Sequence, residues 1–172
     1  MSIKDFLNSF ILCARSRPVV LFVYTWPAFI SYLIASQGGN AFNPLAAFSV
    51  TLSVALVSFS IYFFNDLMDL QDDLMNQELG NPTPASRPLG SGRVSSERLK
   101  SFIVLTGVSG LIVAASISLD VLVLQSIFIG LGFLYSMEPV RLKKRFMMKQ
   151  LTIAAGCVLA NLTGAMAAGG IT

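Results

Sequence analysis

Residues 46–73 read AAFSVTLSVALVSFSIYFFNDLMDLQDD, in which nineteen uncharged residues are followed by four aspartates within nine positions. An uncharged apolar stretch of about 20 residues is the length that crosses the hydrocarbon core of a bilayer as a helix. The stretch therefore predicts a membrane span over about 44–64 that ends at a concentration of negative charge.

The whole 172-residue chain is apolar, with 54% hydrophobic and 12% charged residues and a mean hydropathy of +0.70. Soluble domains carry about 25% charged residues. No charge occurs between Arg17 and Asp66, which leaves room for two spans joined by a turn at Gly38, Gly39 and Asn40. We expect an all-α, polytopic transmembrane helix bundle that forms one membrane domain over 1–172. Its five spans are expected at about 18–36, 44–64, 101–119, 121–137 and 151–170.

The basic residues orient these spans. All twelve Lys and Arg fall before residue 18, within 65–100 or within 138–150, and the alternate turns carry none. Loops with an excess of Lys and Arg stay on the cytoplasmic side of a membrane. We therefore expect a multi-pass integral membrane protein whose N-terminus and charged loops, 65–100 and 138–150, are cytoplasmic. The lipid bilayer is an expected partner, and a nucleic acid is not.

Missing residue types exclude several kinds of site. The chain contains no histidine, which excludes a Ser/His/Asp triad and a histidine-ligated metal. Cys13 precedes the first span and Cys157 lies within the fifth, so both are expected to be free thiols. Any metal ion must therefore be bound by oxygen atoms.

The acidic cluster after the second span is arranged for a cation. If the helix continues past residue 64, a rotation of about 100° per residue places five side chains on one face, namely Asn65, Asp66, Asp69, Asp72 and Asp73. Like charges on one face repel unless a cation lies among them. Oxygen ligands suit Mg²⁺, which commonly binds through one or two carboxylates and substrate phosphates. The cluster predicts a diphosphate held through magnesium; the alternative is a solvated, acidic helix end.

A Pro- and Gly-rich turn flanked by Arg87 and Arg93 favours the diphosphate interpretation. Guanidinium groups bind phosphate oxygens, and exposed backbone N–H groups of the turn can assist them. Ser95 or Ser96 is the expected N-cap of the third span. The alternative is that these arginines only set the topology.

A second basic stretch follows the fourth span and faces the same side of the membrane. It contains Arg141, Lys143, Lys144 and Arg145. Such a run can bind the same diphosphate, or it can anchor the chain to anionic lipid headgroups.

Taken in order, these stretches resemble the motifs of the UbiA superfamily of intramembrane prenyltransferases. The family's first aspartate motif, Asn-Asp-x-x-Asp-x-x-x-Asp, is matched by Asn65, Asp66, Asp69 and Asp73. Its Arg-Pro-Leu/Ile-x-x-Gly-x-Val/Ile-Ser signature is matched by Arg87, Pro88, Leu89, Gly92, Val94 and Ser95. Its tyrosine and basic loop are matched by Tyr135, Ser136, Pro139, Leu142 and Lys143, and its first Arg-Pro pair by Arg17 and Pro18.

The resemblance implies an enzyme that binds a polyprenyl diphosphate through Mg²⁺ and transfers the prenyl group to an aromatic or lipid acceptor. The implied magnesium ligands are Asn65, Asp66, Asp69 and Asp73. The implied diphosphate-binding residues are Asn65, Arg87, Arg93, Tyr135, Lys143 and Lys144. Asp66, Asp69, Asp73 and Arg87 are the implied catalytic residues. The acceptor and the prenyl length do not follow from the sequence.

The chain departs from the family in having one aspartate motif, whereas the family has about nine helices and a second motif that faces the first. A fragment, a split enzyme with a second polypeptide half, and a diverged short protein all fit this departure, and we favour a fragment. We expect the chain alone to be inactive until a C-terminal half is supplied. The alternative function is a non-catalytic membrane protein that binds prenyl diphosphate or assembles with a full-length synthase.

The fifth span carries a ridge of small residues, Gly156, Ala160, Gly164 and Ala168, on one helical face. Such ridges allow close contact between helices in membranes. Asn161 in the same span needs a polar partner on a neighbouring helix. We expect these neighbours to lie outside the 172 residues.

Overall fold

The computed structural model describes residues 3–37, 42–81 and 87–169, all of whose regular elements are helical. The seven α-helices of these residues are α1 (Ile3–Arg15), α2 (Trp26–Ser36), α3 (Pro44–Met68), α4 (Leu70–Glu78), α5 (Ser96–Ile117), α6 (Leu119–Ser136) and α7 (Met148–Ala167). A π-helical turn (Leu21–Thr25) precedes α2, and a 3-10 turn (Leu142–Lys144) precedes α7. The expected turn at 38–40 lies outside the described residues.

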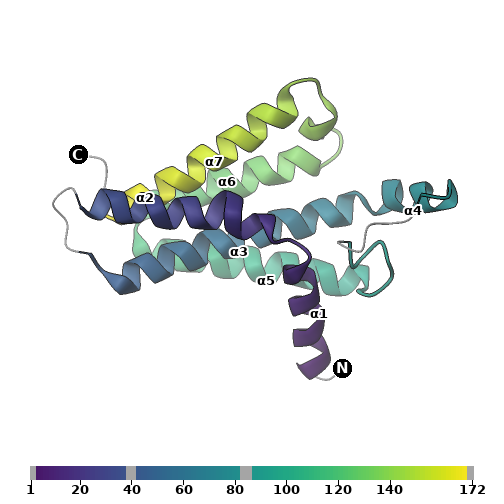
Figure 1. Cartoon of the computed structure of the whole chain (residues 1–172), viewed down its shortest axis with the longest axis horizontal. Coiled ribbons are helices and arrows are strands. Elements are labelled where there is room, and N and C mark those ends of the chain that lie inside the picture. The colour runs from purple at the N-terminus through teal and green to yellow at the C-terminus, as the bar shows by residue number, and fades with distance from the viewer. Residues whose placement is uncertain (1–2, 38–41, 82–86, 170–172) are drawn as a thin grey trace.

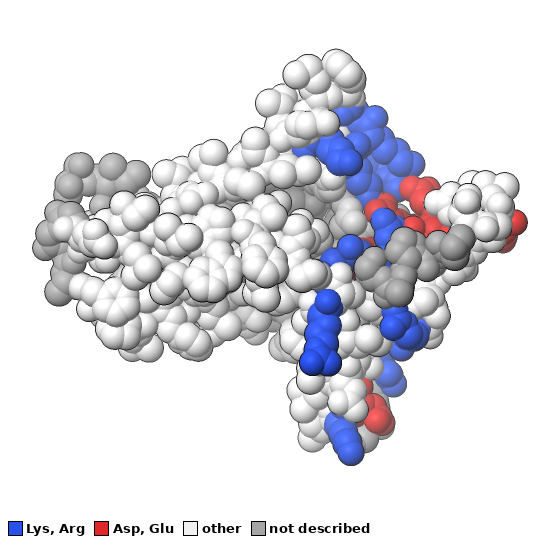
Figure 2. Space-filling view, in the orientation of Figure 1, with Lys and Arg blue, Asp and Glu red and all other residues white. Residues whose placement is uncertain are grey.

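Five of the helices, α2, α3, α5, α6 and α7, run side by side as a bundle, and α1 lies across its axis at one end (Figure 1). Four of them, α3, α5, α6 and α7, are long and apolar enough to cross a membrane, and the segment Leu21–Ser36 is apolar but shorter. The expectation of an all-helical, polytopic membrane fold is confirmed. The basic and acidic side chains visible in this view gather at the end that carries α1 and α4 (Figure 2).

The helix starts follow from ordinary capping. Asn43 accepts hydrogen bonds from the backbone N–H groups of Leu45 and Ala46 at the start of α3. Ser95 accepts one from the Arg98 N–H at the start of α5, which decides between the two expected caps. These side chains satisfy N–H groups that have no partner within the first turn of a helix.

The α3 and α5 helices form the most extensive pair of the bundle because small residues let them approach closely. A Cβ at Gly110 would lie 3.0 Å from the backbone nitrogen of Val57. Buried serines of α3 join the pair, with Ser53 donating to the Gly110 carbonyl at 2.9 Å and Ser60 donating to the Ile103 carbonyl at 2.8 Å. The helix that carries the acidic motif is therefore fixed along its length.

The small residues of α7 pack on elements of the same chain, with Gly164 against α2 and Gly156 against α6 and the π-helical turn, so the expectation of neighbours outside the 172 residues was wrong. A Cβ at Gly164 would lie 2.0 Å from the Ala28 carbonyl oxygen, which only glycine permits. Ser31 of α2 donates to Asn161 Oδ1 at 2.7 Å. Distance in the sequence hides this pairing, because α2 and α7 are separated by more than one hundred residues.

Sequence analysis predicted no separate helix over residues 3–15, which form the amphipathic α1. Phe6 and Phe10 pack edge-on against Phe102 of α5, with ring centroids 4.9 and 5.3 Å apart. The hydrophobic cluster at this contact also includes Leu89 and Val94 of the loop between α4 and α5. Through this cluster α1 supports the loop that carries Arg87.

Candidate diphosphate and metal site

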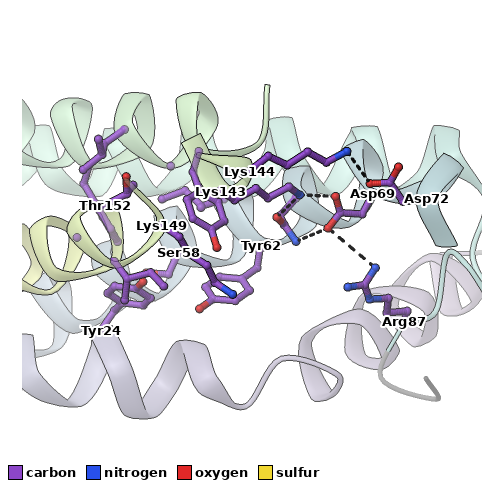
Figure 3. A pocket seen from close by; sticks show the side chains of 18 of the residues that line it. Tyr24, Ser58, Tyr62, Asp69, Asp72, Arg87, Lys143, Lys144, Lys149 and Thr152 are labelled. Atoms are coloured by element: carbon purple, nitrogen blue, oxygen red, sulfur yellow. Dashed lines mark hydrogen bonds and ion pairs between the residues drawn. The ribbon is translucent and has the colours of Figure 1, made fainter. Parts of the chain in front are cut away.

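A cavity of about 480 Å³ lies among α3, α6, α7 and the π-helical turn, and it reaches the charged end of the bundle. Asn65 and seven charged side chains line its outer part: Asp69, Asp72, Asp73, Arg87, Lys143, Lys144 and Lys149. Aromatic and small residues, among them Tyr24, Tyr62, Phe128 and Gly156, line the rest. Figure 3 shows Asp69, Asp72 and Arg87 at one end of the cavity and Tyr24 at the other.

The acidic residues reach the cavity because helical bonding continues past the end of α3. The Asp69 N–H donates to the Asn65 carbonyl at 3.0 Å, and the Asp73 N–H donates to the Asp69 carbonyl at 2.9 Å. Spacings of four residues keep these three side chains on one side. The expected shared face is thus present for Asn65, Asp69 and Asp73, with Asp72 beside them.

Asp69 is the centre of the charged network. Its carboxylate accepts from Lys143 Nζ, from Arg141 Nη2 at 3.2 Å and from Asn65 Nδ2 at 3.3 Å. Arg87 Nη1 lies 3.9 Å from the second oxygen. Only 12% of the Asp69 side chain is exposed, so these charges interact with little solvent screening. Both basic stretches predicted from the sequence therefore meet at one aspartate.

Asn65 connects three elements at the same point. Its Oδ1 accepts from Ser136 Oγ of α6 at 2.7 Å and from Lys143 Nζ at 3.0 Å. Its amide group is oriented by these two bonds because only the oxygen can accept them. Lys143 is half-buried here, and burial lowers its pKa below the usual value, although the hydrogen bond to Asp69 acts to raise it.

Arg87 contacts the acidic face from the loop after α4. It donates from Nη1 to Asp73, and this hydrogen bond raises the already high pKa of the guanidinium. Gly92 allows the loop to turn with φ of +72°, which favours glycine. The N–H groups of Ser91, Gly92 and Arg93 all donate to carbonyls of the loop itself. The expected help from free backbone N–H groups is therefore absent from these three positions.

Asp66 lies outside the cavity lining and forms an ion pair with Arg17. Arg17 donates to it from Nε at 3.0 Å and also from Nη2, and only 4% of the Asp66 side chain is exposed. Asp66 does not line the cavity that Asn65, Asp69 and Asp73 share. The structure therefore splits the four motif residues into a group of three and one aspartate that neutralises Arg17.

The remaining predicted residues take different positions. Tyr135 lines the cavity, and Lys144 lies 3.4 Å from Asp72. Burial acts to raise the pKa of Asp72, but Arg141 and Lys144 outweigh it and hold that pKa below its ordinary value. Arg93 lies outside the cavity lining and donates to Ser91 Oγ at 2.9 Å.

Three further residues belong to this network although they were named only as members of a basic run or a motif and were not predicted as site residues. Arg141 joins Asp69, Asp72 and Glu138, with its backbone at φ of +35°. Arg17 pairs with Asp66, and Ser136 orients Asn65. Arg17 and Ser136 belong to matched motifs, and this match could have indicated them as site residues. Arg141 could have been chosen because it belongs to the second basic stretch.

The oxygen donors at the cavity fit Mg²⁺ as a shared site with a phosphate ligand. Among the described residues, no three acidic or cysteine side chains group into a metal site of their own. Asn65, Asp69 and Asp73 nevertheless present amide and carboxylate oxygens to one cavity. Magnesium usually takes one or two carboxylates and completes its shell with water and substrate phosphates, so this set suffices.

Comparison with known proteins gives both family and fold. The model of the UbiA prenyltransferase family matches residues 24–172. A 4-hydroxybenzoate octaprenyltransferase of Vibrio atlanticus (strain LGP32) is 32% identical over 125 residues, which are 72% of this chain and 40% of the relative.

Solved structures share the fold at lower identity. A structure concerned with digeranylgeranylglyceryl phosphate synthase matches with a TM-score of 0.79 at 23% identity, over 98% of this chain and 55% of its own. A UbiA homolog from Archaeoglobus fulgidus bound to DMAPP and Mg²⁺ matches with a TM-score of 0.75 at 20% identity, over 91% and 54%. The chain thus spans about half the length of these structures and 40% of the curated relative.

Proposed function

The chain belongs to the UbiA prenyltransferase family, and from this premise we propose that its cavity binds a polyprenyl diphosphate together with Mg²⁺ for prenyl transfer to an acceptor. One observation carries the proposal: Asn65, Asp69 and Asp73 share the cavity with Arg87, Lys143 and Lys144. Oxygen donors for a cation and nitrogen donors for an anion stand side by side. A metal diphosphate needs both.

Arg87, Lys143 and Lys144 are the proposed ligands of the phosphate oxygens. Each is held by a carboxylate in the structure, so a diphosphate would take over donors that are already directed toward the cavity. Asn65, Asp69 and Asp73 would hold Mg²⁺, and Asp66 remains a predicted ligand. Arg93 and Tyr135 remain predicted diphosphate-binding residues. When bound, Mg²⁺ would neutralise part of the diphosphate charge and so improve it as a leaving group.

The proposed reaction breaks the bond between the first prenyl carbon and its diphosphate oxygen. The electron pair stays on pyrophosphate, where Arg87 and Lys143 neutralise the growing charge in a partly buried site. Tyr62 and Tyr135 also line the cavity, and the faces of their rings could stabilise the allylic cation. The acceptor bonds to that carbon and releases a proton. Water must be excluded, because it would react with the cation instead.

We propose that catalysis needs a second polypeptide half. The family has a second aspartate motif that faces the first, and this chain spans about half of its solved relatives. The charged residues that line the cavity come from the acidic cluster, from the two basic stretches and, as Lys149, from the start of α7. The chain alone would bind the metal diphosphate from one side, without closing a cavity against water.

The experiment measures binding and transfer separately. Residues 1–172 are expressed in membranes with and without the C-terminal half of a related prenyltransferase. Binding of DMAPP with Mg²⁺ is measured by calorimetry, and prenylated product is measured from radiolabelled DMAPP. We expect binding by the chain alone and product only with the added half. Failure to bind in either preparation would contradict the proposal.

The second candidate function is that of a non-catalytic protein that binds prenyl diphosphate or assembles with a full-length synthase. The single aspartate motif at the cavity favours it, since a binder needs no second motif. Binding with no product in the complemented membranes would support this candidate. For either function we propose that the charged end, with the N-terminus and the loops 65–100 and 138–150, faces the cytoplasm.

A further inference from the structure

Three large apolar side chains of α1 stay exposed although the helix packs on the bundle. Ile3, Leu7 and Ile11 have 79%, 51% and 48% of their surface exposed. They follow one another at intervals of four residues and therefore form one stripe along the helix. Phe6 and Phe10, which pack on α5, lie on the adjacent face. An exposed apolar stripe of this kind marks a surface that contacts a partner or a lipid.

The contacts of α1 place it where the apolar part of the bundle meets the charged end. The rings of Phe10 and Phe63 have centroids 6.1 Å apart, and Phe63 lies two residues before Asn65, the first residue of the acidic motif. The helix lies across the bundle axis at this level (Figure 1). Four helices of the bundle are long and apolar enough to cross a membrane. A helix that lies across membrane spans at their end lies along the membrane surface.

The neighbours of α1 along α5 show which way the stripe faces. Arg98, in the first turn of α5, donates from Nη1 to Ser9 Oγ at 3.1 Å. Phe102 comes one turn later, and the half-exposed Leu105 comes after it, toward the apolar part of the bundle. Ser9 therefore marks the side of α1 that faces the charged end. Leu7 and Ser9 lie about 160° apart round α1, on opposite sides of its two phenylalanines. The stripe therefore faces the apolar part of the bundle, where α5 itself is exposed.

Basic side chains border the stripe on the side away from α5. Lys4 and Arg15 are both exposed. Lys4 precedes Ile11 by seven residues and Arg15 follows it by four, so both lie beside Ile11 on the helix surface. Asp5 lies about 100° further round, toward the charged end. Apolar residues flanked by Lys and Arg are typical of helices that lie in the interface of a membrane.

We propose that α1 is an interfacial anchor: its stripe inserts into the leaflet at the charged end of the bundle, and Lys4 and Arg15 bind the headgroups of anionic phospholipids. Two observations favour lipid over a protein partner. The stripe faces the same way as the exposed apolar surface of α5, and basic side chains border it at the level of the headgroups, where anionic lipids attract them. This surface lies outside the cavity lining, so the inference does not depend on the proposed function.

The first experiment measures how deep the stripe lies. The 172-residue chain carries Cys157→Ser and a fluorophore at Leu7→Cys or, as the matched control, at Asn8→Cys, and each nanodisc holds one copy. Cys13 is only 2% exposed and does not compete for the label. A lipid with its quencher near the headgroup should quench the probe at Leu7→Cys about threefold more than at Asn8→Cys, because the apolar side of an interfacial helix lies about 5–10 Å below the surface. Iodide in water should show the reverse order.

The second experiment measures the choice of lipid. The quencher is carried either by phosphatidylglycerol or by phosphatidylcholine, in nanodiscs that contain both lipids. We expect phosphatidylglycerol to be enriched about fivefold or more at the Leu7→Cys probe, the effect of one basic side chain near an anionic surface. Lys4→Gln combined with Arg15→Gln should abolish the enrichment. Lys100→Gln, which removes an exposed charge from the other side of α5, is the control and should keep it.

Strong quenching by iodide at both Leu7→Cys and Asn8→Cys would overturn the insertion of the stripe and would indicate a protein partner instead, since the stripe would then lie in water in these nanodiscs. Equal enrichment of the two lipids would overturn the assignment to anionic phospholipids. Enrichment that persists when Lys4 and Arg15 are both replaced would overturn it as well.

Discussion

Lys143 donates from Nζ to Asn65 Oδ1 at 3.0 Å, so the loop after α6 is joined to the start of the acidic motif. The same ammonium group bonds to Asp69, one helical turn further along. A cation thus lies between two oxygen groups whose spacing was expected to hold a metal ion. In the structure, Lys143 of the second basic stretch provides part of the positive charge that was expected from magnesium.

The acidic residues should differ in their effect on binding. We expect Asp69→Asn and Asp73→Asn each to weaken Mg²⁺-dependent binding of DMAPP at least tenfold, because each removes a carboxylate from the cavity. Calorimetry at several Mg²⁺ concentrations measures this. Glu97→Gln is the control, since its carboxylate is exposed at the same end of the molecule and pairs only with Lys100 among the described residues. Unchanged binding in both aspartate variants would mean that the cluster is a solvated helix end.

Replacing Arg87 by Lys keeps the charge and removes the planar pair of donors. We expect DMAPP affinity to fall about tenfold or more while membrane insertion stays intact, because lysine cannot bind two phosphate oxygens in the guanidinium geometry. Arg15→Lys, on the exposed side of α1, is the matched control. Equal affinity in Arg87→Lys and wild type would support a role in topology alone.

The protonation of Lys143 should limit binding at alkaline pH. Burial lowers its pKa below the usual 10.5, so the ammonium group loses its proton at a lower pH than an exposed lysine does. As the pH is raised, the affinity for DMAPP should therefore begin to fall before pH 10.5 is reached. In Lys143→Arg the charge persists, and this fall should disappear. Lys100→Arg should retain the wild-type profile, and a fall of the same shape in Lys143→Arg would assign the titration to another group.

The contact between α7 and α2 should be sensitive to a single methyl group. Gly164→Ala would place its Cβ 2.0 Å from the Ala28 carbonyl oxygen, so the helices must separate. We expect a loss of about 1–3 kcal/mol of stability, the usual result of overpacking. Gly130→Ala is the control, because its Cβ meets nothing within 4 Å. Thermal unfolding in detergent compares the two, and an equal Tm would show that the helices adjust without cost.

Much of the helical architecture could be predicted because a membrane span is recognisable from a continuous stretch of apolar, uncharged residues. The uncharged stretch before Asp66 predicted a helix over 44–64, and α3 covers Pro44–Met68. The first span was less regular, since its residues divide into a π-helical turn and α2. The amphipathic α1 was not expected, because hydropathy averaged over a span ignores which side of a short helix is apolar.

The candidate site was predictable as a set of motifs but not as a set of contacts. Spacing correctly placed Asn65, Asp69 and Asp73 on one side, because helical rotation depends on sequence distance alone. The pairing of Asp66 with Arg17 joins residues 49 positions apart, which no periodicity reveals. The partner of the α7 ridge was missed for the same reason: a small residue predicts a close approach without saying which helix approaches.

The ion pairs across the cavity imply a thermodynamic coupling between the two proposed ligands. Diphosphate alone would take Arg87 and Lys143 from their carboxylates, which would leave Asp73 without its ion-pair partner and Asp69 with Arg141 alone in a partly buried place. Magnesium alone would leave the basic groups unpaired in the same way. When both bind, Mg²⁺ would pair with the carboxylates and the diphosphate with the basic side chains. Little new net charge would then be buried. Under the proposed function, each ligand would therefore raise the affinity for the other by the same factor, and the cavity would select the neutralised pair over either ion.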